Sequence, residues 1–371
     1  MPINPFKLER YFAQYEFKTK YLLSSSDCES LSLTELLQMA SPENLELWQG
    51  LKLGYTESSG HPLLRKEVSR LYARINPDQV VIAAPQEAIY IAMQTLLSPG
   101  DHVIAISPAY QSLYEVARSI GCRLTPWKLE AGPDGWTLDL EHLERSITDR
   151  TRLVVLNFPH NPTGHLLLRN EFEAILSLAR KHDLILFSDE MYRLLEYKPD
   201  LRLPAVCDVY EKGISLSGLS KSMALPGLRI GWLATQANAW LTQWQSFKDY
   251  LTICSSAPSE ILGIIALQNK EHIVTRNLEI INGNLAVAER FFSKNSARFT
   301  WFRPQAGSVA FPCWLGEGTV EQFCQQVLDR RGVLLVPGSL FEYPGNHFRI
   351  GLGRRSFSDA IERVEEYLRG V

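Results

Sequence analysis

The sequence predicts an α/β protein with a three-layer αβα large domain, built on a mostly parallel sheet, and a smaller α+β domain. Two observations carry this prediction. Short apolar segments alternate with helical patterns between about residues 80 and 235, and a long helix with shorter strands follows beyond about residue 270. The chain of 371 residues is also long enough for two separate cores.

The apolar segments are rich in Val, Ile and Leu, which is typical of strands buried on both faces of a parallel sheet. We expect strands at 79–83, 102–106, 152–156, 184–187, 213–217 and 228–233, and helices at 87–97, 112–120 and 171–181. Ligands of such sheets bind beyond the carboxyl ends of the strands. The loops that follow the strands are therefore where chemistry is expected.

The remainder of the chain has a different pattern. A long helix is expected at 271–293 and a charged final helix at 358–369, with Pro- and Gly-containing breaks between them. We place the large domain at residues 40–265. The small domain is expected to combine residues 1–39 with residues 266–371.

Composition excludes several classes of protein. A net charge of −3 argues against general affinity for nucleic acid, and no apolar run approaches the roughly 20 residues that span a bilayer. The N-terminus lacks the apolar region of a secretory signal. The six cysteines lack the spacing of metal ligands and are expected to be reduced and mostly buried. We therefore expect a cytoplasmic protein without a bound metal.

Three polar loops follow predicted strands, at residues 157–164, 188–192 and 217–222. Each has an ordinary explanation on its own: Asn-Pro-Thr-Gly forms turns, an acid after a strand caps a helix, and a lysine among Gly and Ser is usually exposed. In this order and spacing, together with the Gly-x-Arg-x-Gly at 227–231, the loops resemble the signatures of the class I/II aminotransferases. These are the fold-type I family of enzymes that use pyridoxal 5′-phosphate (PLP). The resemblance runs from about residue 54 to residue 349.

The resemblance implies PLP as the cofactor and assigns a role to each matching residue. Lys221 is expected to anchor PLP as a Schiff base and to shuttle a proton, both of which suit a desolvated amine with a lowered pKa. Asp189 is expected to pair with the pyridinium nitrogen and keep it protonated. The remaining groups are Tyr192 and Asn161 at the ring's phenolic oxygen, and Arg229 and Ser220 at the phosphate.

The phosphate loop departs from the family's pattern. Residues 84–87 match the loop that binds phosphate at a helix N-terminus, which makes Pro85 and Gln86 candidate contacts. Proline has no N–H to donate, and Gly218 stands where many family members have a hydroxyl residue. Phosphate binding is therefore expected to rely more on Arg229, Gln86 and Ser220.

Three further residues extend the resemblance. Tyr110 matches the aromatic residue that stacks on the cofactor ring. Tyr55 matches the tyrosine that reaches the phosphate in the other subunit, which implies a homodimer with shared active sites. Arg349 matches the arginine that binds the substrate's α-carboxylate, to which its planar fork is suited, and Asn161 is expected beside the same substrate.

The leading interpretation is transamination, in which an amino group passes from an amino acid to a 2-oxo acid. A PLP lyase, decarboxylase or cyclising synthase would use the same cofactor site and stays open. A binding or regulatory protein descended from the fold would be expected to lack Lys221 or Asp189, and both are present.

The segment 24–29 bears on the choice of substrate. Asp27 and Glu29 could face a cationic side chain, or Asp27 could cap the helix expected near residue 31. The sequence leaves both readings open. Cys28 has no base nearby in the sequence that would lower its pKa, so we assign it no role.

Overall fold

The computed structural model describes residues 2–370. Within them, eight strands form one sheet in the order β1-β8-β7-β6-β5-β2-β3-β4. They are β1 (Val80–Ala83), β2 (His102–Ser107), β3 (Arg123–Ala131), β4 (Trp136–Leu138), β5 (Thr151–Asn157), β6 (Ile185–Asp189), β7 (Gly213–Gly218) and β8 (Gly231–Thr235). Adjacent strands from β7 through to β3 are parallel, whereas β8 and β4 are antiparallel to their neighbours. The predicted mostly parallel sheet is confirmed.

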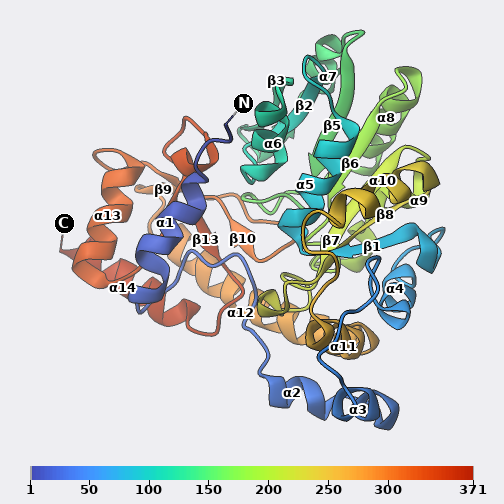
Figure 1. Cartoon of the computed structure of the whole chain (residues 1–371). Coiled ribbons are helices and arrows are strands. Elements are labelled where there is room, and N and C mark those ends of the chain that lie inside the picture. Colours follow the sequence, from blue (N-terminus) through green and yellow to red (C-terminus); the bar gives the residue numbers. More distant parts are fainter. Residues whose placement is uncertain (1, 371) are drawn as a thin grey trace.

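Helices cover both faces of this sheet (Figure 1). Successive side chains of a strand point to opposite faces. Val81 and Leu233 accordingly join an apolar cluster with α5 (Pro85–Leu96) and α10 (Asn238–Lys248), whereas Ile82 and Trp232 join another with α4 (Pro62–Ser69) and α11 (Ala257–Gln268). The other helices of this part are α2 (Leu33–Gln38), α3 (Pro42–Gln49), α6 (Ser112–Ile120), α7 (Leu140–Ser146), α8 (Arg169–Lys181) and α9 (Val206–Val209). The three-layer architecture is thus confirmed.

A separate core lies in the carboxyl-terminal part of the chain. It contains the helices α12 (Lys270–Lys294), α13 (Val320–Arg331) and α14 (Phe357–Arg369), and the short strands β9 (Phe299–Thr300), β10 (Val309–Ala310), β11 (Cys313–Trp314), β12 (Val336–Pro337) and β13 (Phe348–Gly351). Leu23 and Cys28 join this core from the N-terminal segment. The helix α1 (Lys7–Tyr15) also lies against this part, where the Tyr11 hydroxyl donates to the Leu335 carbonyl at 2.9 Å (Figure 1). The domain boundary near residue 265 stays a prediction.

Several predicted elements differ from the observed ones in their bounds or their type. Helix α5 begins at Pro85, two residues early, because proline suits the first helical position. The segment expected as a strand at 228–233 first forms a 3₁₀ turn, η4 (Pro226–Leu228), and then a left-handed residue, Arg229, with φ 55°. The strands β3 and β4 were not predicted, because β3 lies near the edge of the sheet and its residues are mostly exposed or half-buried.

All six cysteines are unpaired, and Cys28, Cys207 and Cys324 are buried. Within residues 2–370, no helix has both the length and the apolar character needed to cross a membrane.

Candidate active site

Four adjacent parallel strands end at one edge of the sheet, and the predicted site loops follow them. The strands β7, β6, β5 and β2 are neighbours in that order. β5 ends at Asn157, β6 ends at Asp189, and β7 ends at Gly218, three residues before Lys221. Tyr110 follows β2. The structure therefore brings the loops together, as the sequence predicts.

Lys221 is a partly buried lysine whose Nζ donates to Ser26 Oγ at 2.8 Å. Burial lowers the pKa of Lys221; Asp27 opposes this effect and the Arg349 guanidinium adds to it. An amine with a lowered pKa is more often the free base. It can then act as a nucleophile or accept a proton.

Asp189 is buried at the carboxyl end of β6, where its Oδ1 accepts from the Met191 N–H at 3.1 Å. Burial raises the pKa of Asp189 from 3.8 to about 7, although that hydrogen bond and the charge of Lys221 work in the opposite direction. A cationic ring nitrogen placed against this carboxyl group would lower its pKa again and hold it as a carboxylate. The site thus suits a positively charged partner.

The cofactor-free Asp189→Asn variant is expected to lose less stability than the cofactor-free wild type as the pH rises from about 4 to about 7. The folded wild type retains the Asp189 proton up to about pH 7, whereas the unfolded chain releases it near 3.8, so rising pH favours unfolding in this window. Buried His160 and His347, with pKa values lowered to about 3 and about 4, give slopes of the opposite sign. Both proteins contain these histidines, so the difference between their denaturant unfolding curves isolates Asp189. Equal pH slopes would contradict the assignment.

Tyr192 contacts the segment that binds Lys221, whereas Asn161 is held within its own loop. The buried Tyr192 hydroxyl donates to the Ser26 carbonyl at 2.8 Å, and the Asn161 N–H donates to Asn157 Oδ1 at 3.0 Å. The role of Ser26 was not predicted; the serine run at 24–26 is the signal in the sequence. Contact of Tyr192 and Asn161 with a phenolic oxygen stays a prediction.

Arg349 is a fully buried cation on β13. Its guanidinium donates to Asn161 Oδ1 at 3.3 Å and to the Ser24 carbonyl at 3.0 Å, while Nε has no partner. The rings of Phe12 and Phe341 lie 5.8 Å and 5.3 Å from its Cζ. Among the described residues, no carboxylate pairs with it. A buried charge without a counter-ion is costly, so this guanidinium is well suited to receive an anion.

The residues expected to bind phosphate lie in the first turn of α5 and in the loops that follow β7. Ser220 is buried, and its Oγ has no partner within residues 2–370, so a hydroxyl is available there. Gln86 is exposed in the first turn of α5. Arg229 is exposed and donates to the Pro226 carbonyl at 3.0 Å. A buried hydroxyl, a helix N-terminus and an exposed cation fit a phosphate group.

The two departures from the family's phosphate loop are in contact with each other. A Cβ at Gly218 would lie 2.9 Å from Gly231 Cα and 3.2 Å from Pro85 Cγ. A Cβ at Gly231 would meet Pro85 Cγ at 2.8 Å. The backbone of Ile230 and Gly231, together with Pro85, therefore leaves no room for a hydroxyl side chain at position 218.

Tyr110 and Tyr55 lie in different surroundings. The Tyr110 hydroxyl donates to Glu9 Oε1 at 2.6 Å, and its ring centroid lies 4.8 Å from that of Phe6. Burial, followed by the charge of Glu9, raises the pKa of Tyr110. Tyr55 is 89% exposed, and no hydrogen bond or ring contact links it to the other site residues in the described chain. Stacking of Tyr110 on a cofactor ring stays a prediction.

The acidic segment before α2 forms contacts that the sequence did not identify. Asp27 pairs with Arg354 at 2.7 Å, and Glu29 Oε2 accepts from the Arg355 N–H at 3.1 Å. Ser32 caps α2, so the suggestion that Asp27 caps this helix is wrong. Burial and the charge of Asp27 raise the pKa of Cys28 to about 12, which makes a thiolate unfavourable.

Known proteins of one family are similar to this chain over most of its length. The family model described as aminotransferase class I and II matches residues 18–359. Capreomycidine synthase of Streptomyces vinaceus is 32% identical over 95% of this chain and 89% of its own. Arginine–pyruvate transaminase of Pseudomonas aeruginosa is 28% identical over 84% of this chain and 81% of its own.

Two solved structures are similar over nearly their whole length. A PLP-dependent aminotransferase from Streptococcus suis has a TM-score of 0.93 and 31% identity, covering 100% of this chain and 99% of that one. The PLP-dependent cyclase OrfR has a TM-score of 0.91 and 25% identity, covering 100% and 98%.

Proposed function

This chain belongs to the class I and II aminotransferases, and on that premise we propose that it transfers the amino group of an amino acid to a 2-oxo acid. The observation that carries the proposal is the buried guanidinium of Arg349. It donates to Asn161 Oδ1, and no carboxylate pairs with it among the described residues. It offers an amino acid's carboxylate a counter-ion close to an amine with a lowered pKa.

Each residue of the site has a proposed role in this reaction. When bound, PLP would supply an electron sink for the substrate's α-carbon. Lys221 Nζ would take and return the proton of that carbon, and the Asp189 carboxylate would keep the ring nitrogen protonated. Arg349 orients the carboxylate, and Asn161 fixes the Arg349 fork. We assign the phosphate to Ser220, Arg229, Gln86 and the N-terminus of α5, which begins at Pro85, and the phenolic oxygen to Tyr192 and Asn161.

We further propose a homodimer in which Tyr55 reaches the neighbouring active site. Large apolar side chains are exposed on two segments: Leu53 (85%) and Tyr55 (89%) on one, and Tyr250 (90%) and Ile253 (48%) on the other. Exposed apolar side chains grouped in this way are typical of an interface. A measured molar mass of a single chain in solution would contradict the proposed homodimer. We place the enzyme in the cytoplasm, in keeping with its unpaired cysteines.

Cyclisation or elimination on the same cofactor is the second candidate. It is favoured by the similarity to a protein named capreomycidine synthase and to a protein named as a PLP-dependent cyclase. Transamination and these alternative reactions all begin by weakening a bond at the substrate's α-carbon. The residues expected to bind the cofactor therefore suit any of them.

Incubation of the PLP-loaded enzyme with single amino acids, without an oxo acid, separates the two functions. We begin with arginine, because one relative is named for it. Transfer predicts one equivalent of aminated cofactor per site and then a stop, with turnover restored by pyruvate. Continuous release of ammonia or of a cyclised product, without aminated cofactor, would instead support the second candidate.

A further inference from the structure

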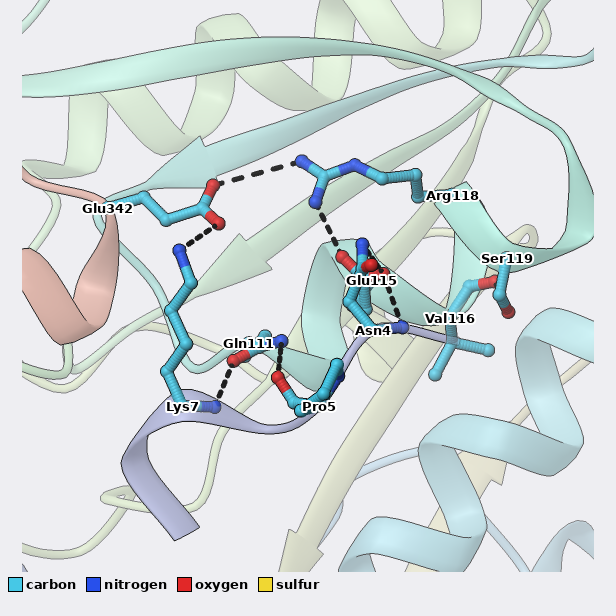
Figure 2. Close-up of polar contacts among 9 residues, drawn as sticks. All are labelled: Asn4, Pro5, Lys7, Gln111, Glu115, Val116, Arg118, Ser119 and Glu342. Atoms are coloured by element: carbon cyan, nitrogen blue, oxygen red, sulfur yellow. Dashed lines mark hydrogen bonds and ion pairs between the residues drawn. The ribbon is translucent and has the colours of Figure 1, made fainter. Parts of the chain in front are cut away.

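The first residues of the chain are tied to helix α6 of the large domain (Figure 2). The Asn4 backbone N–H and Nδ2 both donate to Glu115 Oε1, at 3.1 Å and 2.7 Å. The Lys7 N–H donates to Gln111 Oε1 at 2.8 Å, and Gln111 Nε2 returns a bond to the Pro5 carbonyl at 3.0 Å. This stretch, residues 4–16, is called the arm below. Hydrogen bonds to Gln111 and Glu115 therefore fix the first residues of the arm against α6.

The arm is also tied to the carboxyl-terminal part. Lys7 Nζ pairs with Glu342 at 3.0 Å, and Glu342 lies 3.8 Å from Arg118 of α6 (Figure 2). One turn further along, the Tyr11 hydroxyl donates a hydrogen bond to the Leu335 carbonyl. The arm thus bridges the two parts of the protein beside the active site.

One face of the arm is directed toward the catalytic residues. Glu9, Phe12 and Glu16 are spaced by three and four residues, which places them on the same side of a helix. Glu9 accepts the Tyr110 hydroxyl, and Phe12 packs near Arg349. Glu16 follows α1 directly and interacts electrostatically with Glu9, Asp27 and Lys221.

Within residues 2–370, two carboxylates on this face form no ion pair with a cation. Glu9 receives only the neutral hydroxyl of Tyr110, and Glu16 forms no hydrogen bond or ion pair within residues 2–370. Asp27 differs, because Arg354 neutralises it at 2.7 Å. Burial, then Asp27 and Glu9, raise the pKa of Glu16, whereas the charges of Arg354 and Lys221 work in the opposite direction. The arm therefore supplies two carboxylates that no ion pair within residues 2–370 neutralises directly.

A second observation points to a ligand at the same place. Arg349 is 1% exposed, and its Nε has no partner among the described residues. Arg349 interacts electrostatically with Glu9, and Glu16 interacts with Glu9 and Lys221, so this cation and the two carboxylates of the arm lie around one site. An amino acid with a basic side chain would provide an anion for Arg349 and a cation for the arm.

We infer that Glu9 and Glu16 bind the amino or guanidino group at the end of the substrate's side chain. The inference rests on the proposed function, because it needs the substrate's carboxylate at Arg349 and its reacting end at Lys221. An acidic side chain would be repelled by these carboxylates, and a neutral one would leave them unpaired. Glu9 and Glu16 are thus specificity-determining residues for a basic amino acid.

The test compares arginine with citrulline, a neutral amino acid of nearly the same shape, on the PLP-loaded full-length enzyme. Affinities are measured by calorimetry and by the change in visible absorbance. Arginine is expected to bind about 100-fold more tightly, about tenfold for each carboxylate, since hydrogen bonds between charged groups are roughly twice as strong as neutral ones. Glu9→Gln and Glu16→Gln should each lower this ratio by about tenfold and leave citrulline binding nearly unchanged.

The controls keep the two proposals separable. Gln at position 9 can still accept the Tyr110 hydroxyl, and thermal unfolding checks that the arm stays docked. Glu46→Gln, at an exposed acid on α3, should leave the ratio unchanged. Equal binding of arginine and citrulline by the wild type overturns the inference, as does an equal loss of both ligands in the variants, while the proposed function stands. If no amino acid changes the absorbance, the proposed function itself fails, and the inference fails with it.

Discussion

Replacing Lys221 with alanine is expected to lower the rate of the reaction by about 10³-fold or more and to remove the covalent link to the cofactor. Proton transfer by a positioned side chain contributes roughly 10²–10⁴-fold on its own. In this chain the nearest described hydrogen-bonding partner of Lys221 is the Ser26 hydroxyl, which is too weak a base to replace it. Borohydride trapping followed by mass spectrometry measures the covalent link, and single-turnover kinetics measure the rate.

Lys248 provides a matched control. It is also a buried lysine whose pKa is lowered by burial, but its Nζ donates to the carbonyls of Ser58 and Ile253. Lys248→Met should retain the trapped cofactor mass, and Lys221→Arg should lose it while keeping the positive charge. A trapped cofactor in folded Lys221→Ala would show that another amine forms the link.

Arg349→Gln is expected to lower kcat/KM for amino acids by about 100-fold. Charged hydrogen bonds are worth roughly 1.5–3 kcal/mol, and the guanidinium contributes both the charge and a planar fork. Arg349→Lys should recover only part of the loss, since an ammonium group cannot bind a carboxylate in a bidentate manner. Steady-state kinetics with a single amino acid donor test both variants.

An amine that lacks the carboxylate distinguishes recognition from misfolding. The wild type should prefer an amino acid strongly over its decarboxylated amine, and Arg349→Gln should lose most of that preference while still reacting slowly with the amine. If Arg349→Gln lowers activity toward both compounds by the same factor, Arg349 supports the structure of the site and does not bind the carboxylate.

The edge of the sheet that carries Asn161, Asp189 and Lys221 could be predicted because each residue follows a short apolar strand that is visible in the sequence. Parallel strands then place these loops together without any knowledge of distant contacts. The edge strand β3 could not be found in the same way, because its exposed residues interrupt the apolar pattern.

The surroundings of the site depended on contacts between residues far apart in the chain. Glu9 lies 101 residues from Tyr110, and Asp27 lies 327 residues from Arg354, so no local pattern links either pair. Pro85 and Gly218 could each be recognised in the sequence as a departure from the family's pattern. That they lie next to each other could not be predicted, because they are far apart in the chain.

The arm also bears on how such proteins are compared. The family model begins to match at residue 18, so Glu9, Phe12 and Glu16 all lie before the matched segment. The matched segment contains the residues expected to bind the cofactor. It does not contain α1, whose Glu9 accepts a hydrogen bond from Tyr110 and whose Phe12 lies near Arg349. If Glu9 and Glu16 select the substrate as inferred above, transferring residues 4–16 to a relative with the same catalytic loops is expected to transfer the preference for a basic amino acid.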